Sequence, residues 1–231
     1  ERLGGVTEIH VGSISGSYST GTVSGGSSVG GLVGSISGAT VETSYSTGAV
    51  EGNQLIGGLV GYNSGDVATS YAGGPVSGDW RVGGLAGLND GSIVDSYSTG
   101  AVSGNKDVGG LVGYNVDLAV DGYVMMGNIA TCYSAGSVAG STGVGGLVGA
   151  GRTNYVTACF WDVETSGQST SLAGEGKTTA ELQTAATFLD AGWDFVDETV
   201  NGEKDTWWIT EGADYPRLWW EAEGPSAAAD D

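Results

Sequence analysis

Apolar residues along the chain come in short runs, and the runs return at a nearly fixed distance. A leucine followed by valine or alanine comes directly after a glycine pair five times. The first glycine stands at positions 30, 57, 83, 109 and 145, so the intervals are 27, 26, 26 and 36 residues. The segments between the glycines are short and rich in Val, Ile, Thr and Tyr, which favours strands over helices.

An aromatic position keeps the same interval. Its members are Tyr18, Tyr45, Tyr71, Tyr97, Tyr133 and Phe160. The single long interval carries an insertion near residues 117–126. A fixed period of this size is typical of a solenoid, because it is too short for a propeller blade and too β-like for helical repeats. We therefore expect an all-β fold, a β-solenoid (β-helix) of about six coils with ~26 residues each.

The glycine pairs fit the tight corners of such a coil. Glycine reaches a positive φ at little cost, and it lets the backbone pass where a Cβ would clash. Stacking the coils predicts an internal ladder made of Leu32, Leu59, Leu85, Leu111 and Leu147. A neighbouring row faces either the core or the outside, and the pattern leaves both open. Its members are Val33, Val60, Ala86, Val112 and Val148.

The aromatic row needs a change of backbone direction just before it. Ile93, Asp95 and Tyr97 share one parity along an extended strand. If all three faced the core, the Asp95 carboxylate would be buried, which is costly without a partner. We therefore expect a bend or bulge here and an aromatic ladder, either in the core or along one surface.

The segment SYSTGAVSGNKDVGGLVGYN, residues 96–115, resembles the GLUG motif. This repeat is found in large surface and secreted proteins of bacteria and archaea, among them adhesin-like chains and some immunoglobulin-cleaving peptidases. The resemblance covers about residues 1–160 and implies a β-solenoid with a stalk-like or adhesive role. It carries over no catalytic residue, so we expect no enzyme activity. The last part of the chain also resembles the segment that often closes such repeats.

Residues 161–223 have a different pattern. Thr178 and Glu181 have the spacing of a capping box, an apolar face follows through Leu189, and Gly192 suits the helix end, so we expect one helix. Short strands rich in tryptophan follow. We expect a small α+β cap over 161–223 and a tail over 224–231, with 1–160 as the solenoid. The tryptophans expected to form the cap or an interface are Trp193, Trp207, Trp208, Trp219 and Trp220. The alternative is a surface that binds sugars or a partner.

The charge narrows the set of partners. The chain carries 27 acidic and 7 basic residues, a formal net charge of −20. Nucleic acids and anionic membranes are therefore excluded as partners, and no apolar stretch reaches the ~18 residues of a membrane span. An acidic, Gly-rich chain of this kind favours an extracellular or cell-surface location. His10, the only histidine, stands beside Glu8 and suggests neither a triad nor a zinc site.

Two small groups of residues suggest further chemistry. Cys132 and Cys159 stand 27 residues apart, one coil, so they form either a disulfide or two buried thiols in a ladder. A calcium site is the second candidate, because several acidic and polar residues follow part of the calcium-loop pattern. They are Asp197, Thr199, Asn201 and Asp205. Trp208 stands where that pattern needs its bidentate Glu, so an acidic hairpin is the competing interpretation.

Three functions fit these observations. The first is a structural protein whose exposed first coil meets another copy head to tail, which would build a homopolymer for a surface filament or adhesive matrix. The second is a monomeric adhesin that holds surface glycans or host and matrix proteins on its aromatic rows. The third is a non-catalytic scaffold within a larger secreted enzyme.

Overall fold

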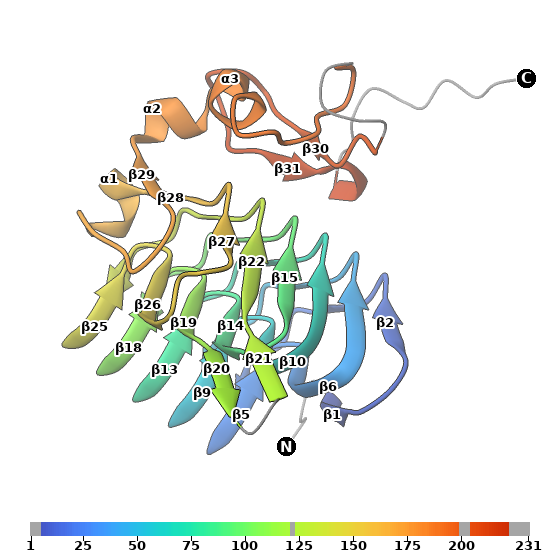
Figure 1. Ribbon diagram of the computed structural model, residues 1–231, viewed down its shortest axis with the longest axis vertical. Coiled ribbons are helices and arrows are strands. Elements are labelled where there is room, and N and C mark those ends of the chain that lie inside the picture. The colour runs from blue at the N-terminus through green and yellow to red at the C-terminus, as the bar shows by residue number, and fades with distance from the viewer. Residues whose placement is uncertain (1–5, 121–122, 199–203, 222–231) are drawn as a thin grey trace, which may run out of the picture. The chain divides into compact units, whose positions relative to one another are not determined.

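A computed structural model describes residues 6–120, 123–198 and 204–221 of the chain (Figure 1). The chain divides into two compact units, Glu1–Lys177 and Thr178–Asp231. The first unit is a stack of coils whose strands lie side by side along one direction, and the sheets that run through successive coils are parallel (Figure 1). The predicted all-β solenoid is confirmed.

One coil shows how the chain runs. It begins with β9 (Gln54–Gly57), crosses the glycine pair into the long strand β10 (Val60–Ala68), and turns into β11 (Tyr71–Ala72) and β12 (Val76–Ser77). The next coil then begins at β13 (Trp80–Gly83). Each strand pairs with its equivalent one coil away, for example Val60 with Ala86 and Tyr71 with Tyr97. The 26-residue period is therefore the length of one turn.

Four sheets collect the equivalent strands. The sheet of β9 also holds β5 (Ser27–Gly30), β13, β18 (Lys106–Gly109) and β25 (Thr142–Gly145). The sheet of β12 also holds β4 (Val23–Ser24), β8 (Val50–Glu51), β17 (Val102–Ser103) and β24 (Val138–Ala139). The sheet of β11 also holds β3 (Tyr18–Ser19), β7 (Tyr45–Ser46), β16 (Tyr97–Ser98), β23 (Tyr133–Ser134), β28 (Phe160–Asp162) and β29 (Glu175–Lys177).

The largest sheet contains β10 and changes along the stack. The long strands β6 (Val33–Glu42) and β10 each span the positions that two consecutive short strands occupy in the other coils. These are β1 (Val6–Ile9), β2 (Ser13–Ser15), β14 (Ala86–Asn89), β15 (Ser92–Val94), β19 (Val112–Asn115), β22 (Asn128–Ala130), β26 (Val148–Gly151) and β27 (Val156–Thr157). The sheets of β9 and β12 have five strands each. The stack therefore has five complete turns, with partial turns at its ends.

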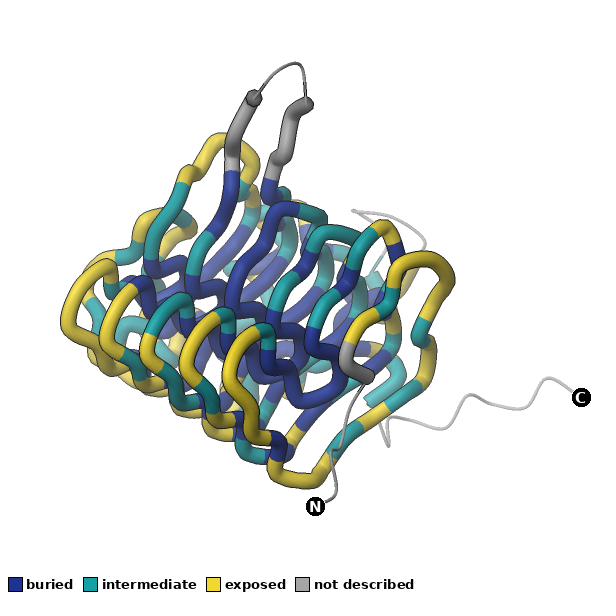
Figure 2. Tube along the Cα trace, turned by 90° about the horizontal axis from the view of Figure 1, so that it is seen from below, coloured by how far each residue is buried: buried dark blue, intermediate teal, exposed yellow. Residues whose placement is uncertain are grey.

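Two apolar cores run along the stack. The larger one contains the predicted leucine ladder, and the row from Val33 to Val148 faces inward with it. The smaller one lies between the sheets of β9 and β12 and consists of valines and one isoleucine, such as Val50, Ile56 and Val82. Figure 2 shows buried residues through the interior of the coils and exposed residues on the outer turns. Burial of these rows in every coil supplies the main hydrophobic stabilisation.

The glycine pairs serve close approach and not a positive φ. A Cβ on the first glycine, as at Gly83, would lie 2.0 Å from the carbonyl oxygen of Ala86. A Cβ on the second, as at Gly84, would lie 2.0 Å from the carbonyl oxygen of Gly110 in the next coil. The predicted close approach at these pairs is confirmed, whereas the expectation of positive φ was wrong. The left-handed positions are mostly held by other residue types, such as Leu55 and Arg81, with φ of 56° and 57°.

The expected bend before the aromatic row is present. Asp95 has a φ of 49°, and Thr43, Thr69 and Thr131 take similar values at the same place in other coils. The left-handed residue reverses the side-chain parity. Ile93 and, beyond the bend, Ala72 and Trp161 at the position of Ser98 therefore belong to the larger core, whereas the tyrosines of the aromatic row do not. Asp95 accepts a hydrogen bond from the Thr131 hydroxyl one coil away. The insertion forms an antiparallel hairpin of β20 (Asp117–Val120) and β21 (Tyr123–Met126).

The boundary between the units follows from strand pairing. The sequence predicts that the solenoid ends at residue 160, whereas the compact units divide after Lys177. The reason is that β29 pairs with β28, and the short helix α1 (Val163–Ser166) between them is capped at its N-terminus by the Asp162 side chain. Trp161 also belongs to the larger core. Residues 161–177 therefore continue the solenoid.

The second unit is small and centred on aromatic residues. It contains α2 (Thr179–Leu182), α3 (Ala185–Leu189), β30 (Trp207–Trp208), β31 (Arg217–Leu218) and the 3-10 helix η1 (Trp219–Glu221). The capping box of Thr178 and Glu181 is confirmed. The single helix expected after it is two helices, because Thr184 has extended backbone and the Gln183 carbonyl accepts the Gly212 N–H at 2.7 Å.

Candidate functional site

A buried asparagine ladder crosses the middle coils. Asn63, Asn89 and Asn115 are at most 1% exposed. Asn63 Nδ2 donates to Asn89 Oδ1 at 2.7 Å, and Asn89 Nδ2 donates to Asn115 Oδ1 at 2.8 Å. Each amide thus satisfies its neighbour, which removes the cost of burying it. Our interpretation of the sequence missed this ladder, although the three residues stand 26 apart after the glycine–leucine phrase.

A ladder of small polar side chains forms the corner before the aromatic row. Ser44 Oγ accepts the Ser17 N–H at 3.1 Å, and Ser70 Oγ accepts the Ser44 N–H at 3.2 Å. Each of these hydroxyls also donates to a carbonyl two residues earlier. Cys132 and Cys159 occupy the same place in the last two coils, where their thiols lie 3.0 and 3.1 Å from the corresponding carbonyls. The cysteines therefore replace serines in a structural corner.

Both cysteines are buried free thiols in this structure and not a disulfide. Burial, and next the neighbouring Cys159 thiol, raise the pKa of Cys132 well above its ordinary value.

Because the thiolate is the reactive form, we expect neither cysteine to react with a disulfide reagent in the native protein at pH 8, and both to react after unfolding. Thiol titration with and without denaturant measures this. A native mass lower by two hydrogens would instead show a disulfide.

The tyrosines of the aromatic row form one stacked column. Ring centroids from Tyr18 through Tyr133 lie 4.9 to 5.2 Å apart with interplanar angles of 8° or less. Phe160 continues the register opposite Tyr133. Tyr18, in the first coil, is 64% exposed. The column is a structural ladder that presents aromatic surface at its first member.

A second tyrosine pairs with a carboxylate on the large sheet. Tyr62 Oη donates to Asp90 Oδ2 at 2.5 Å. Burial, followed by this hydrogen bond and the Asp90 charge, raises the pKa of Tyr62 to about 12. The pair favours protonated tyrosine, so it stabilises the fold below pH ~10, and this contribution is lost as the pH rises toward 12.

The two ends of the solenoid differ. At the last coil, residues of the 168–177 segment bond to the outermost strands. Gln168 Nε2 donates to the Val138 carbonyl at 2.9 Å, and Ser171 Oγ accepts the Val148 N–H at 2.9 Å. At the first coil, β3, β4 and β5 are the outer strands of their sheets, and Val11 nearby is 87% exposed. Within the described residues, β24 and β25 likewise end their sheets.

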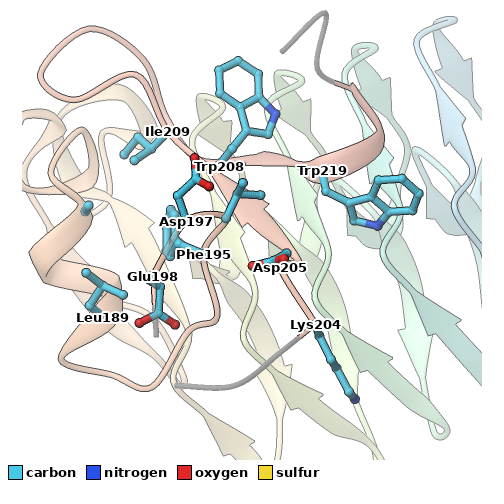
Figure 3. Close-up of a pocket in the computed structure, with 11 residues that line it drawn as sticks. Leu189, Phe195, Asp197, Glu198, Lys204, Asp205, Trp208, Ile209 and Trp219 are labelled. Atoms are coloured by element: carbon cyan, nitrogen blue, oxygen red, sulfur yellow. The ribbon is translucent and has the colours of Figure 1, made fainter. Parts of the chain in front are cut away.

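The predicted tryptophans have separate roles. Trp193 and Trp207 are fully buried and, with Phe188, form the core of the second unit, where their ring centroids lie 4.5 Å apart. Trp208 and Trp219 instead line a cavity of about 690 Å³ together with Phe195 (Figure 3). Trp220 is half-buried. The interpretation of this region as a cap of the solenoid stays a prediction.

Of the calcium candidates, Asp197 and Asp205 line this same cavity. Thr199 and Asn201 lie outside the described residues. Among the residues that are described, no three His, Cys, Asp or Glu side chains stand close enough to hold a metal ion. His10 Nε2 lies 3.3 Å from Glu8 Oε1, and both side chains are exposed. In the described ranges, no helix has the length and apolar character that crossing a membrane requires.

The stacked register and the glycine-pair geometry define a β-solenoid built from one repeated unit. Residues 78–103 match a family model described as the GLUG motif. This confirms the resemblance for one repeat, and equivalent residues of the neighbouring coils pair with it in register. The match and the fold are consistent with a GLUG-motif repeat protein that has a structural or adhesive role. No curated protein sequence and no solved structure matches the chain significantly.

Proposed function

We propose that the chain is an extracellular, non-enzymatic structural protein, a self-associating subunit of a cell-surface filament or adhesive matrix. The observation that supports this most directly is that two sheets run through the stack and end in outer strands at both ends, with the Val138 carbonyl of the last coil already bonded to Gln168. β4 and β5 end two sheets at the first coil, and β24 and β25 end the same two sheets at the last coil. Such edges are templates for pairing with another chain.

The geometry allows head-to-tail addition because the edges are complementary in register. Within the stack, Gln54 N–H bonds to the Gly26 carbonyl, and Thr142 N–H bonds to the Asn105 carbonyl. By the same pattern, the Ser27 N–H of one copy would reach the Ser141 carbonyl of another. A contact between unlike surfaces propagates, so it builds a filament and not a closed dimer.

A proline at the first coil tests this. Ser27 is the first residue of β5 and is exposed, and its N–H points away from the stack by the pattern of its equivalents. Ser27→Pro removes that donor while the internal ladder keeps its bonds. We expect association to weaken by about tenfold or more, because a hydrogen bond is lost and the ring blocks close approach. Sedimentation velocity across concentrations and negative-stain electron microscopy measure the effect.

The matched control is Thr22→Pro. Thr22 stands in the same coil at the position that Pro75 occupies naturally two coils later. This variant should assemble like the unmodified chain, and both variants should keep its thermal stability. Particles that stay single at every concentration and salt condition would overturn the filament proposal, as would equal loss of assembly in the two variants.

A further inference from the structure

The second unit contains a cavity that the structural role does not use. Its volume of about 690 Å³ lies in the usual range for ligand pockets. Its walls come from α3, the segment around Phe195, and the strand β30 with the residues that follow it (Figure 3). Every lining residue belongs to this one unit.

One side of the cavity is aromatic. The indole of Trp208 is fixed, since its Nε1 donates to the Leu218 carbonyl at 3.2 Å. Trp219 is 54% exposed, an unusual position for the largest apolar side chain. Indole faces are the best aromatic partners for a cation, and an accessible one in a cavity favours a ligand of that kind.

The polar side of the cavity carries excess negative charge. Among the described residues, three carboxylates line it, those of Asp197, Glu198 and Asp205, against one ammonium, that of Lys204. Lys204 forms no salt bridge with these carboxylates in the part of the chain that the structure describes. Its ammonium points away from Asp205 (Figure 3), while its backbone N–H is held by Asp194 Oδ2 at 2.9 Å. The exposed carboxylates of Asp197 and Asp205 are thus uncompensated there.

We propose that this cavity binds a basic side chain, arginine above all, on an extended segment of a partner protein. Ionised carboxylates only accept hydrogen bonds, so they fit a group that only donates, and the planar guanidinium donates five and stacks on indole faces. A neutral sugar would need donors and acceptors together. Among the described lining side chains, charged donors come from Lys204 alone. The cavity volume leaves room for neighbouring peptide residues beside the basic one.

The inference does not rest on the proposed self-association, because it concerns the other compact unit. The two fail separately: the Ser27→Pro chain should be impaired in assembly and still bind a basic peptide. A polycation would also bind weakly anywhere on a chain of charge −20, so the informative quantity is the difference between matched variants.

The experiment uses the full chain and a fluorescein-labelled Gly-Ser peptide with one central arginine, followed by fluorescence anisotropy at low and moderate salt. We expect Trp219→Ala to weaken binding about three- to tenfold, and the double variant Asp197→Asn, Asp205→Asn about tenfold at low salt. Leu172→Ala and the double variant Glu42→Gln, Glu51→Gln are the matched controls on the solenoid. They change an exposed apolar side chain and two exposed charges.

Binding by the controls should equal that of the unmodified chain, and a peptide with glutamine in place of arginine should bind at least tenfold more weakly. Circular dichroism verifies that each variant is folded. The proposal is overturned if the arginine peptide does not bind, or if the pocket and control variants weaken it equally. It is also overturned if a neutral oligosaccharide such as cellohexaose binds in a Trp219-dependent manner and the peptide does not.

Discussion

Replacing Gly84 with alanine is expected to destabilise the solenoid by about 4 kcal/mol or more, the range of the most severe single substitutions. The new Cβ would lie 2.0 Å from the Gly110 carbonyl oxygen and 2.5 Å from Ser98 Oγ. Gly84 lies in the middle of the stack, so a coil on each side prevents its backbone from moving away. Relief would require separating the coils, which breaks the hydrogen bonds of several sheets at once.

The control is Gly73→Ala in the same repeat. A Cβ there would meet only Thr47 Cγ2 at 3.6 Å and Thr99 Oγ1 at 3.7 Å, which is ordinary contact. Its φ is not in the left-handed region, so the substitution should be neutral or slightly stabilising through the unfolded chain. Urea unfolding followed by circular dichroism compares the two. Similar midpoints for both variants would refute the steric role of the glycine pair.

Replacing Asn89 with alanine is expected to cost about 3 kcal/mol, because two buried amides lose a partner together. Asn63 Nδ2 loses its 2.7 Å acceptor, and Asn115 Oδ1 loses its 2.8 Å donor. Each buried polar group left unsatisfied costs about 1–3 kcal/mol. Asn63 Nδ2 keeps a bond to the Ser92 carbonyl, which places the total below the sum of the two maxima.

The comparison is Asn63→Ile at the end of the ladder. Ile36 already holds this register position in the preceding coil, so an isoleucine at 63 would pack against it. Only one amide of the ladder then loses a neighbour, and apolar contact offsets part of the cost. We expect less than half the effect of Asn89→Ala in the same urea experiment. An equal or larger effect at position 63 would contradict the ladder as the source of stability.

The sequence predicted the fold because every coil repeats one set of positions. The leucine after each glycine pair, the aromatic row and the bend at Asp95 follow from spacing and from the cost of burying a carboxylate. Pairing of equivalent residues one coil apart converts a linear period directly into register. The asparagine ladder obeys the same rule and was open to the same argument.

The cavity of the second unit could not be predicted in this way. Trp208 and Trp219 stand in similar tryptophan pairs beside Trp207 and Trp220, and no period separates those that build the core from those that line the cavity. Whether each indole is buried in the core or lines the cavity depends on how the short, non-repeating elements of this unit pack against one another. The sequence predicts one helix in this unit, but the structure has two, α2 and α3. Contacts with a distant segment separate them, since Gly212 and Glu211 bond to the backbone at the break.

The sequence by itself determined the period, the stacked register, the inward leucine row and the presence of an aromatic ladder, because in a solenoid each residue's main neighbour is its own equivalent one coil away. Only the tertiary structure decided which backbone atoms each glycine of a pair approaches, which residues adopt left-handed backbone, and how many sheets a coil crosses. Those depend on the distance between backbones that face each other across the coil. The carboxylates and indoles of the cavity likewise come together only through tertiary contacts between segments that share no repeat.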